Sequence, residues 1–227
     1  MPRIYKFTRT GLKLLYKIRH HRGHGIHSPF VFNLITKVIE EKTPYHAYED
    51  IRYALESAHI RKSSLSKEDK LFFRLVNYFS AQHILEIGSG YGITTLFLTA
   101  PSNNIVCACL EPSAKKCDEA EKLYAIWNKD IRLYPGEKLI IPDRKPDCIF
   151  INLNSFPLSD NIVQYLSDIT YEKTFIIIEG IRTKKRNQAL WKSIINMDSR
   201  TVVLDLFNIG IVFFDKTLYR WEYKISF

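Results

Sequence analysis

The sequence has no apolar run that reaches the roughly 18–20 residues of a membrane-spanning helix. Its N-terminus also lacks the apolar stretch and the small-residue cleavage site of a secretory signal. No internal repeat and no low-complexity tract is present. Of the 227 residues, 46% are hydrophobic and 25% are charged, which is ordinary for a globular domain. We therefore expect a cytoplasmic protein with one substantial core.

Cysteine is scarce, and its spacing argues against a zinc or redox site. The chain has four cysteines, at 107, 109, 117 and 148, and no Cys-x-x-Cys pair. Cys107 and Cys109 are two residues apart in a strand-like run, so their side chains should face the same way. We expect all four to be free thiols in or near the core.

Acidic residues are absent from residues 1–39, which contain eight lysines and arginines. This segment therefore accounts for eight of the nine net positive charges of the chain. Tyr5, Phe7 and Tyr16 are mixed with these basic side chains. The pattern is typical of a solvated helix face, of a nucleic-acid contact, or of attraction to an anionic membrane surface, and all three readings stay open.

The spacing of apolar residues divides the chain into a helical region, residues 1–80, and an α/β domain, residues 81–227. In the first region, helices are expected over residues 12–18 and 30–39, the latter with Ser28 as N-cap and Pro29 at its first position, and over Lys67–Phe79. In the second region, short apolar runs alternate with helical segments, which predicts a doubly wound, mostly parallel sheet.

The elements expected in the α/β domain follow from this alternation. The buried strands are predicted at His83–Ile87, Ile105–Leu110, Asp147–Ile151 and Thr174–Glu179. The helices are predicted at Ile93–Thr99, Ser113–Trp127, Ser159–Ser167 and Lys184–Ile195. Three final runs with only short turns between them, predicted to pair antiparallel, are Thr201–Phe207, Gly210–Phe214 and Leu218–Ile225.

The most informative stretch is residues 84–95, in which an apolar strand leads through a glycine-rich turn into a helix. Gly88, Gly90 and Gly92 alternate, so the turn can bend sharply and a ligand can approach its backbone closely. The helix that follows offers N–H groups to an anion such as a carboxylate. Ile93 stands where a dinucleotide fingerprint has its third glycine, and no Gly-Lys-Ser/Thr follows, so neither that fingerprint nor a P-loop is present.

Two acids accompany the glycine turn. Glu86 precedes it by two residues, and Glu111 ends the next strand, where a carboxylate can accept hydrogen bonds from both hydroxyls of a ribose. Together these residues resemble class I S-adenosylmethionine-dependent methyltransferases, whose first motif is acid-x-Gly-x-Gly-x-Gly and whose second is an acid at the end of strand two. The resemblance spans residues 82–227 and looks closest to the O-methyltransferase-like branch.

The resemblance implies a Rossmann-like, mostly parallel seven-stranded sheet with a C-terminal antiparallel hairpin. It also implies S-adenosylmethionine as cofactor and methyl transfer to oxygen or nitrogen of an unidentified acceptor, with a small molecule favoured. The cofactor's amino-acid half would lie on Glu86 and the glycine turn, its ribose on Glu111, and its adenine and methyl ends near Gly136, Glu137 and Asn152. The full set of expected cofactor-binding residues is Glu86, Gly88, Ser89, Gly90, Tyr91, Gly92, Thr94, Glu111, Pro112, Gly136, Glu137 and Asn152.

The ends of strands four and five depart from the pattern that this resemblance implies. In metal-dependent O-methyltransferases, acids at these places hold a divalent cation. Here they are Asn152 and Glu179-Gly180, and one carboxylate with one amide makes a poor Mg²⁺ site. We therefore expect no tightly bound catalytic metal. Glu179 is a candidate general base, or else a surface acid at a strand end.

A histidine-rich segment at residues 19–30 ends in His-Gly-Ile-His-Ser-Pro-Phe. It resembles a stretch that precedes the methyltransferase domain in a group of bacterial proteins, many from Bacteroidetes. Three readings are open: a helix start, a lid from which His24 or His27 reaches the cofactor or acceptor cleft, and a transition-metal site. His27 is thus the second candidate catalytic residue.

Two further functions compete with methyl transfer to a small molecule. One is a degenerate module that binds the cofactor without turnover, which the altered ends of strands four and five favour. The other is a nucleic-acid methyltransferase that uses the basic N-terminus. Against it, Asn154-Ser-Phe-Pro157 does not fit the Asp/Asn-Pro-Pro-aromatic motif of enzymes that methylate exocyclic amines.

Overall fold

The computed structural model describes residues 28–60, 64–158 and 161–227. The helix predicted over residues 12–18 and the histidines up to His27 lie outside the described residues. Ser28 caps the first described helix, as predicted: its Oγ accepts a hydrogen bond from the backbone N–H of Val31 at 3.4 Å, and Pro29 follows at the first helical position.

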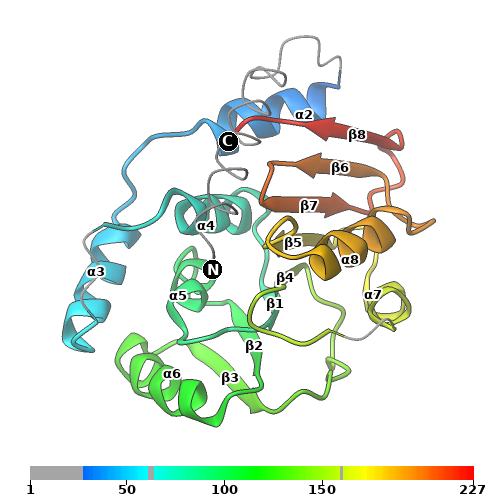
Figure 1. The fold of residues 1–227 in the computed structure, drawn as a ribbon. Helices are drawn as coiled ribbons and strands as arrows, with labels where there is room; N and C mark the ends of the chain where they lie inside the picture. Colours follow the sequence, from blue (N-terminus) through cyan, green and yellow to red (C-terminus); the bar gives the residue numbers. More distant parts are fainter. Residues whose placement is uncertain (1–27, 61–63, 159–160) are drawn as a thin grey trace, which may run out of the picture.

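The described residues form one eight-stranded sheet in the order β3-β2-β1-β4-β5-β7-β6-β8 (Figure 1). The strands are β1 (His83–Ile87), β2 (Val106–Glu111), β3 (Asp130–Pro135), β4 (Cys148–Asn152), β5 (Phe175–Glu179), β6 (Val202–Asp205), β7 (Ile209–Phe213) and β8 (Trp221–Lys224). Strands β1 to β5 pair in parallel, and β7 is antiparallel to both β5 and β6. The predicted doubly wound sheet and its C-terminal antiparallel hairpin are confirmed.

Helices cover both faces of the sheet, with α4, α5 and α6 on one face and α7 and α8 on the other (Figure 1). They are α2 (Pro29–Leu34), the π-helix η1 (Ile35–Ile39), α3 (Ala47–Ser57), α4 (Lys67–Phe79), α5 (Ile93–Thr99), α6 (Ala114–Trp127), α7 (Ile162–Ile169) and α8 (Lys185–Ile195). The predicted bounds of α4 and α5 match those observed. Helix α3 and strand β3 were not among the predicted elements, and β3 has no fully buried residue that would mark it as an apolar run.

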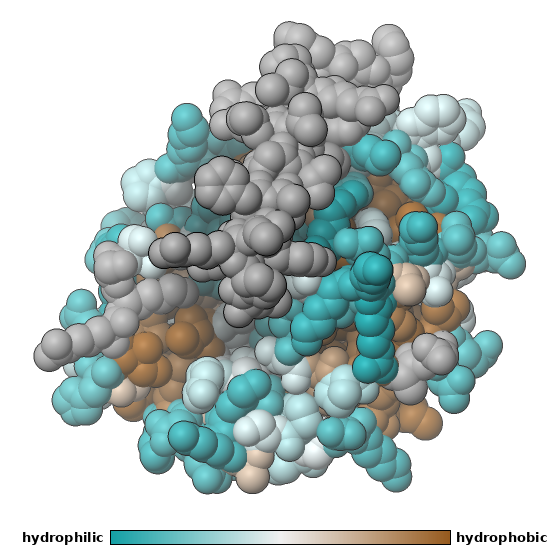
Figure 2. Space-filling view, in the orientation of Figure 1, coloured by the Kyte–Doolittle hydropathy of each residue, from teal (hydrophilic) through white to brown (hydrophobic). Residues whose placement is uncertain are grey.

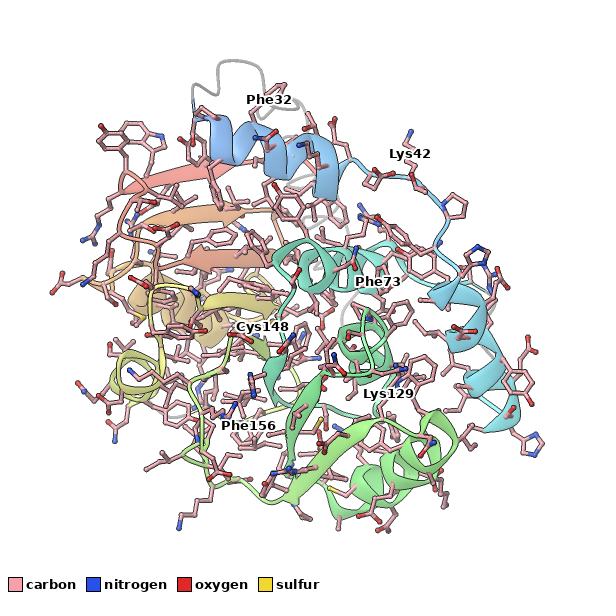
Figure 3. The ribbon with its side chains drawn as sticks, turned by 180° about the vertical axis from the view of Figure 1, so that it is seen from behind. Phe32, Lys42, Phe73, Lys129, Cys148 and Phe156 are labelled. Atoms are coloured by element: carbon pink, nitrogen blue, oxygen red, sulfur yellow. The ribbon has the colours of Figure 1, made fainter. Side chains whose placement is uncertain are left out.

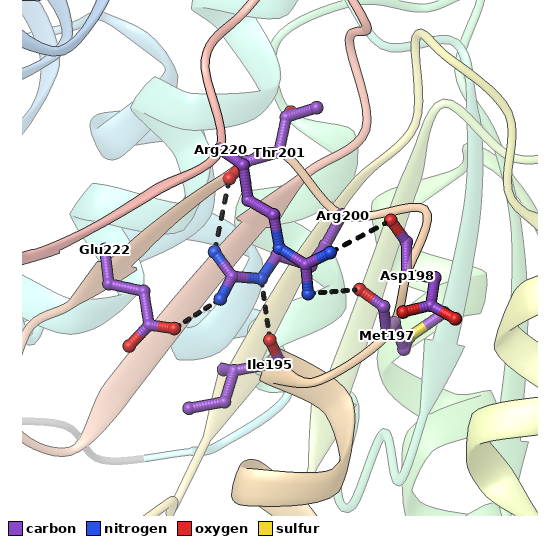
Figure 4. A network of polar contacts seen from close by, with 7 residues as sticks. All are labelled: Ile195, Met197, Asp198, Arg200, Thr201, Arg220 and Glu222. Atoms are coloured by element: carbon purple, nitrogen blue, oxygen red, sulfur yellow. Dashed lines mark hydrogen bonds and ion pairs between the residues drawn. The ribbon is translucent and has the colours of Figure 1, made fainter.

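The strand count and the pairing of the last strand differ from expectation. The sheet has eight strands instead of seven, and β8 pairs in parallel with β6 instead of antiparallel. Two arginines link β8 and the residue before it to the segment around the end of α8 (Figure 4). The buried Arg200 donates through Nε to the Ile195 carbonyl at 2.7 Å and pairs with Glu222 of β8. Arg220 donates to the carbonyls of Met197 and Asp198 at the end of α8. Neither contact is visible as an apolar pattern.

Side chains alternate between two cores because strand residues point to opposite faces. Phe150 of β4 packs with Phe72 of α4 at a ring distance of 4.9 Å, whereas Ile149 and Ile151 join the core under α7 and α8. Buried residues of α2, η1, α3 and α4 belong to the first of these cores. The outer surface seen in Figure 2 is largely hydrophilic, with hydrophobic areas between the polar side chains.

All four cysteines are buried free thiols, as predicted. Cys107 and Cys109 face the same core, with their sulfurs 3.6 Å apart. Figure 3 shows Cys148 in the interior, while Phe32 and Lys42 lie at the outer edge. None of the described helices is long and apolar enough to cross a membrane.

Candidate functional site

The carboxyl ends of β1 to β6 meet at one edge of the sheet, whereas β7 runs in the opposite direction. The strand order changes direction between β1 and β4, which is the switch point where open α/β sheets bind ligands. The glycine turn leaves β1 at this point. Every described residue from the predicted site lies on β1, β2, β4 or β5 or in a segment that directly follows β1, β2 or β3.

The glycine turn has a backbone that only glycine adopts easily. The φ angles of Gly88, Gly90 and Gly92 are +87°, +62° and +79°. The N–H groups of Gly88 and Ser89 both donate to the carbonyl of Leu110, at 2.8 and 3.2 Å, which ties the turn to the end of β2. A Cβ on Gly92 would lie 2.6 Å from the Tyr124 ring, so this glycine also permits close packing of α6.

Glu111 at the end of β2 is completely buried and is bonded to the glycine turn. Its Oε2 accepts from the Gly90 N–H at 2.8 Å, and its Oε1 accepts from the Ser113 N–H at 3.0 Å. The ammonium of Lys116 lies 3.5 Å from Oε1. The two oxygens thus connect the glycine turn to the start of α6.

The middle of the turn is its most open part. A Cβ on Gly90 would meet no atom within 4 Å, and Tyr91 is exposed with the Lys116 ammonium 6.0 Å from its ring centre. Ser89 is buried, and its Oγ has no hydrogen-bond partner among the described residues. Thr94 Oγ1 lies 3.5 Å from Asp69 Oδ1 on α4.

The segments that follow β2 and β3 come together beside Glu111. Gly136 has a φ of +110°, and its N–H donates to the Glu111 carbonyl at 3.0 Å. Pro112 is half-buried and Glu137 is exposed. The resemblance implies that this Gly-Glu pair lies near the adenine, and the structure places it beside the residue expected to bind the ribose.

Glu86 lies in the core on the side of α5 and α6. It is completely buried, its Oε2 accepts from Thr95 Oγ1 at 2.6 Å and from the Cys109 thiol at 3.4 Å, and Thr95 Oγ1 lies 2.7 Å from the Tyr124 hydroxyl. Its Oε1 has no partner among the described residues. Burial raises the pKa of Glu86 to about 7. The Glu86 carboxyl thus contacts α5 on the core side of the turn and does not face the open side of Gly90.

Asn152 and Glu179 face each other at the ends of β4 and β5. They are paired in register, and Asn152 Nδ2 donates to Glu179 Oε2 at 3.1 Å. Asn152 Oδ1 accepts from the Asn154 N–H at 3.0 Å. Both side chains are half-buried. The structure therefore brings the expected pocket residue and the candidate base into one hydrogen-bonded pair.

An ion pair that was not predicted from the sequence lies at the same edge. Arg182 forms two hydrogen bonds with Asp205 at the end of β6, at 2.7 and 2.5 Å, and its guanidinium lies 5.4 Å from the Phe207 ring. Phe207 has an unusual φ of +71°. Its carbonyl also accepts from Arg182. An acid that ends an apolar run, as Asp205 does, was the available signal.

A second missed cluster surrounds Gly180, which follows β5 with a φ of +87°. Asn187 donates to the Gly180 carbonyl at 2.9 Å and to Thr183 Oγ1 at 2.7 Å, and the Asn154 amide packs where a Gly180 Cβ would be. Thus the absence of a side chain at Gly180 leaves room for the Asn154 amide.

Potential metal ligands meet once within the described ranges. The carboxylate of Glu86 and the thiols of Cys107 and Cys109 lie within 4.8 Å of one another, all buried. This group lies in the core and not at the ends of β4 and β5, the places where metal-dependent O-methyltransferases hold a cation. His27 lies outside the described residues, so its predicted catalytic role stays a prediction.

Comparison with solved structures identifies the fold. A Podospora anserina methyltransferase bound to S-adenosylhomocysteine superimposes with a TM-score of 0.56, 13% identity, and coverage of 83% of this chain and 97% of that chain. A second similar structure is the O-methyltransferase TomG of Streptomyces achromogenes, which is involved in tomaymycin synthesis and was solved in complex with S-adenosylmethionine. Its TM-score is 0.52 at 14% identity, with coverage of 76% of this chain and 91% of that chain. The O-methyltransferase of Bacillus cereus, in complex with S-adenosylhomocysteine, has a TM-score of 0.50 at 21% identity, with coverage of 81% of this chain and 97% of that chain.

The chain has the Rossmann-like methyltransferase fold. Neither a family model nor a curated protein matches the sequence. The expected sheet architecture is therefore confirmed by structure, while the chemistry depends on the residues at the carboxyl edge.

Proposed function

We propose that the protein is an S-adenosylmethionine-dependent methyltransferase that acts on a small molecule through oxygen or nitrogen. The observation that carries this proposal is the glycine turn at the switch point, with three positive φ angles and Glu111 bonded directly to it. The solved structures with this fold that hold S-adenosylmethionine or S-adenosylhomocysteine support the choice of cofactor.

The residues of the turn fit such a cofactor. Gly90 presents an open backbone, and Ser89 has a buried hydroxyl without a partner among the described residues. The first N–H groups of α5 point out of the helix start and suit the carboxylate of an amino acid. Gly88, Ser89 and Gly90 would hold the amino-acid half, and Glu111 the ribose. Glu86 would act indirectly, by fixing β1 to α5.

Bound S-adenosylmethionine supplies an activated methyl group on a sulfonium, so the protein needs mainly to position the acceptor. Asn152 and Glu179 lie at the ends of β4 and β5, next to the switch point. Asn152 would line the pocket for the methyl group. Glu179 would accept a proton from an acceptor hydroxyl or amine, because it is a half-buried carboxylate at the end of a central strand.

Calorimetric titration with S-adenosylmethionine and with S-adenosylhomocysteine tests this proposal. We expect micromolar affinity, a binding free energy of about −8 kcal/mol, for the unmodified protein. Glu111→Ala should weaken binding by about a hundredfold, because two hydrogen bonds to a charged group are lost. Glu121→Ala, which removes an exposed acid from α6, is the matched control and should bind as the unmodified protein does.

The thermal midpoint of each variant shows whether it is folded at the temperature of the titration. Absence of heat with both ligands, in protein that melts cooperatively, would exclude the cofactor and leave only the fold. Equal affinity of the Glu111→Ala and Glu121→Ala variants would show that the ribose is held elsewhere.

A further inference from the structure

The connection from β3 to β4 differs from the other crossovers of the sheet. Helices α5, α6, α7 and α8 lie in the connections that leave β1, β2, β4 and β5, whereas residues 136–147 contain no helix. Parallel strands are usually joined by a helix that covers the sheet. Because this connection passes β2 and β1 to reach β4, it leaves part of their face without a helical layer (Figure 1).

The exposure of β2 shows the missing layer. Cys107 and Cys109 point toward α5 and α6 and are completely buried. Val106 and Ala108 point to the opposite face and are only half-buried, although β2 lies inside the sheet between β1 and β3. Ile140, from the helix-free connection, packs only partly onto this face.

A cavity of about 640 Å³ lies between this face and the connection. That volume falls within the range of natural small-molecule sites. Leu85, Val106 and Ala108 contribute small or branched apolar side chains from the neighbouring strands β1 and β2, which form the floor of the cavity on the sheet. Such a floor suits a planar ring system better than a branched or sugar-like ligand.

Charged side chains surround the apolar floor. Arg132 of β3 and Arg144 of the connection line the cavity against one acid, Asp143. Arg144 has no ion pair or hydrogen bond within the described part of the chain, and Arg132 meets Asp130 only through Nε, at 3.6 Å. The half-exposed ring of Tyr134 completes the rim. An anionic group with two or three oxygens is the natural partner for two guanidinium groups.

We propose that this cavity binds a planar aromatic molecule with one anionic group, a carboxylate, sulfonate or phosphate. It is a separate site from the carboxyl edge, since none of the glycine-turn residues lines it, and His83 and Val106 place it toward the starts of β1 and β2. The proposal does not depend on the proposed methyl transfer.

Two fluorescent probes with the same ring system test both parts of the proposal. 8-Anilinonaphthalene-1-sulfonate carries the anion, and N-phenyl-1-naphthylamine is its uncharged counterpart. The sulfonate should bind at least about tenfold more tightly to the full chain, because it gains charge-assisted hydrogen bonds. Equal affinities for the two probes would overturn the assignment of an anion site.

Variants locate the binding. Arg144→Ala and Arg132→Ala should each weaken the sulfonate by about fivefold to tenfold and leave the neutral probe within about twofold. Ala108→Phe fills the floor and should weaken both probes by at least about tenfold. Arg52→Ala, which removes an exposed arginine from α3, is the matched control and should change neither affinity.

Several results would overturn the proposal. The first is sulfonate binding that is unchanged in both arginine variants, and the second is binding that is unchanged in folded Ala108→Phe protein. The third is a protein that sediments as a dimer and binds neither probe, because a second copy of the chain would then occupy this face. The arginine variants alter only exposed side chains. They therefore decide the test if Ala108→Phe does not fold.

Discussion

The two ends of the carboxyl edge are built in different ways. Around the glycine turn, each contact uses a backbone N–H as donor: Gly88 donates to the Leu110 carbonyl, and Gly90 donates to the Glu111 carboxylate. At the ends of β4, β5 and β6, the contacts are made between side chains, such as the pair of Arg182 and Asp205. The first kind needs particular residue types at fixed spacing, and the second needs partners from distant parts of the chain.

The largest effect is expected when a side chain is added at Gly92 in the glycine turn. Gly92→Ala should lower the free energy of unfolding by about 4 kcal/mol, because it combines a left-handed backbone with overpacking. The new Cβ would lie 2.6 Å from the ring of Tyr124, which is held by its contact with Thr95. Urea denaturation followed by circular dichroism measures the change.

Gly90→Ala is the control, because it has the same kind of backbone without the clash. Its φ is +62°, and its Cβ would meet nothing within 4 Å. The expected loss is about 1 kcal/mol from the backbone alone. Equal losses at Gly90 and Gly92 would mean that packing against Tyr124 contributes nothing.

The difference between the two ends also explains what could be predicted from the sequence. Positive φ angles require glycine, so Gly88, Gly90 and Gly92 mark their turn in the sequence itself. Apolar periodicity likewise placed β1 and α5 at their observed bounds. These signals are local, and no distant partner is needed to interpret them.

The remaining features depend on partners that no local pattern reveals. Arg200 meets Glu222 only where β8 lies beside β6, and the Asn152–Glu179 pair exists only once β4 and β5 are in register. The burial of the Glu86 carboxyl was also hidden, since the motif suggested a cofactor contact. The direction of the Glu86 side chain follows from the alternation of side chains along β1, which points it toward α5.

The buried acid beneath the turn predicts a dependence of stability on pH. The pKa of Glu86 is raised by burial from its ordinary value of 4.5 to about 7. Between these values the folded protein retains a proton that the unfolded chain has lost, so stability falls as pH rises through this window. The loss is on the order of 3 kcal/mol and is complete above pH 7.

Glu86→Gln isolates this effect, because the amide keeps the shape of the side chain and does not ionise. The free energy of unfolding of the unmodified protein, compared with that of Glu86→Gln, should decline from pH 5 to pH 8 in urea titrations. Parallel curves for the two proteins across this range would show that Glu86 titrates alike in the folded and unfolded states.

Substitutions at the ends of β4, β5 and β6 should change the free energy of unfolding less than Gly92→Ala does. Their effect should be measurable as an interaction free energy between paired side chains. A double-mutant cycle of Arg182→Ala and Asp205→Ala should give an interaction free energy of about 2 kcal/mol, because the pair is bidentate and Asp205 is buried. The exposed pair of Arg52 and Glu49 is the control, with an expected coupling of about 0.3 kcal/mol. If both cycles gave the same small value, the Arg182–Asp205 pair would not fix the β6 end of the edge, and the turn after β6 would be held by its backbone, as the glycine turn is.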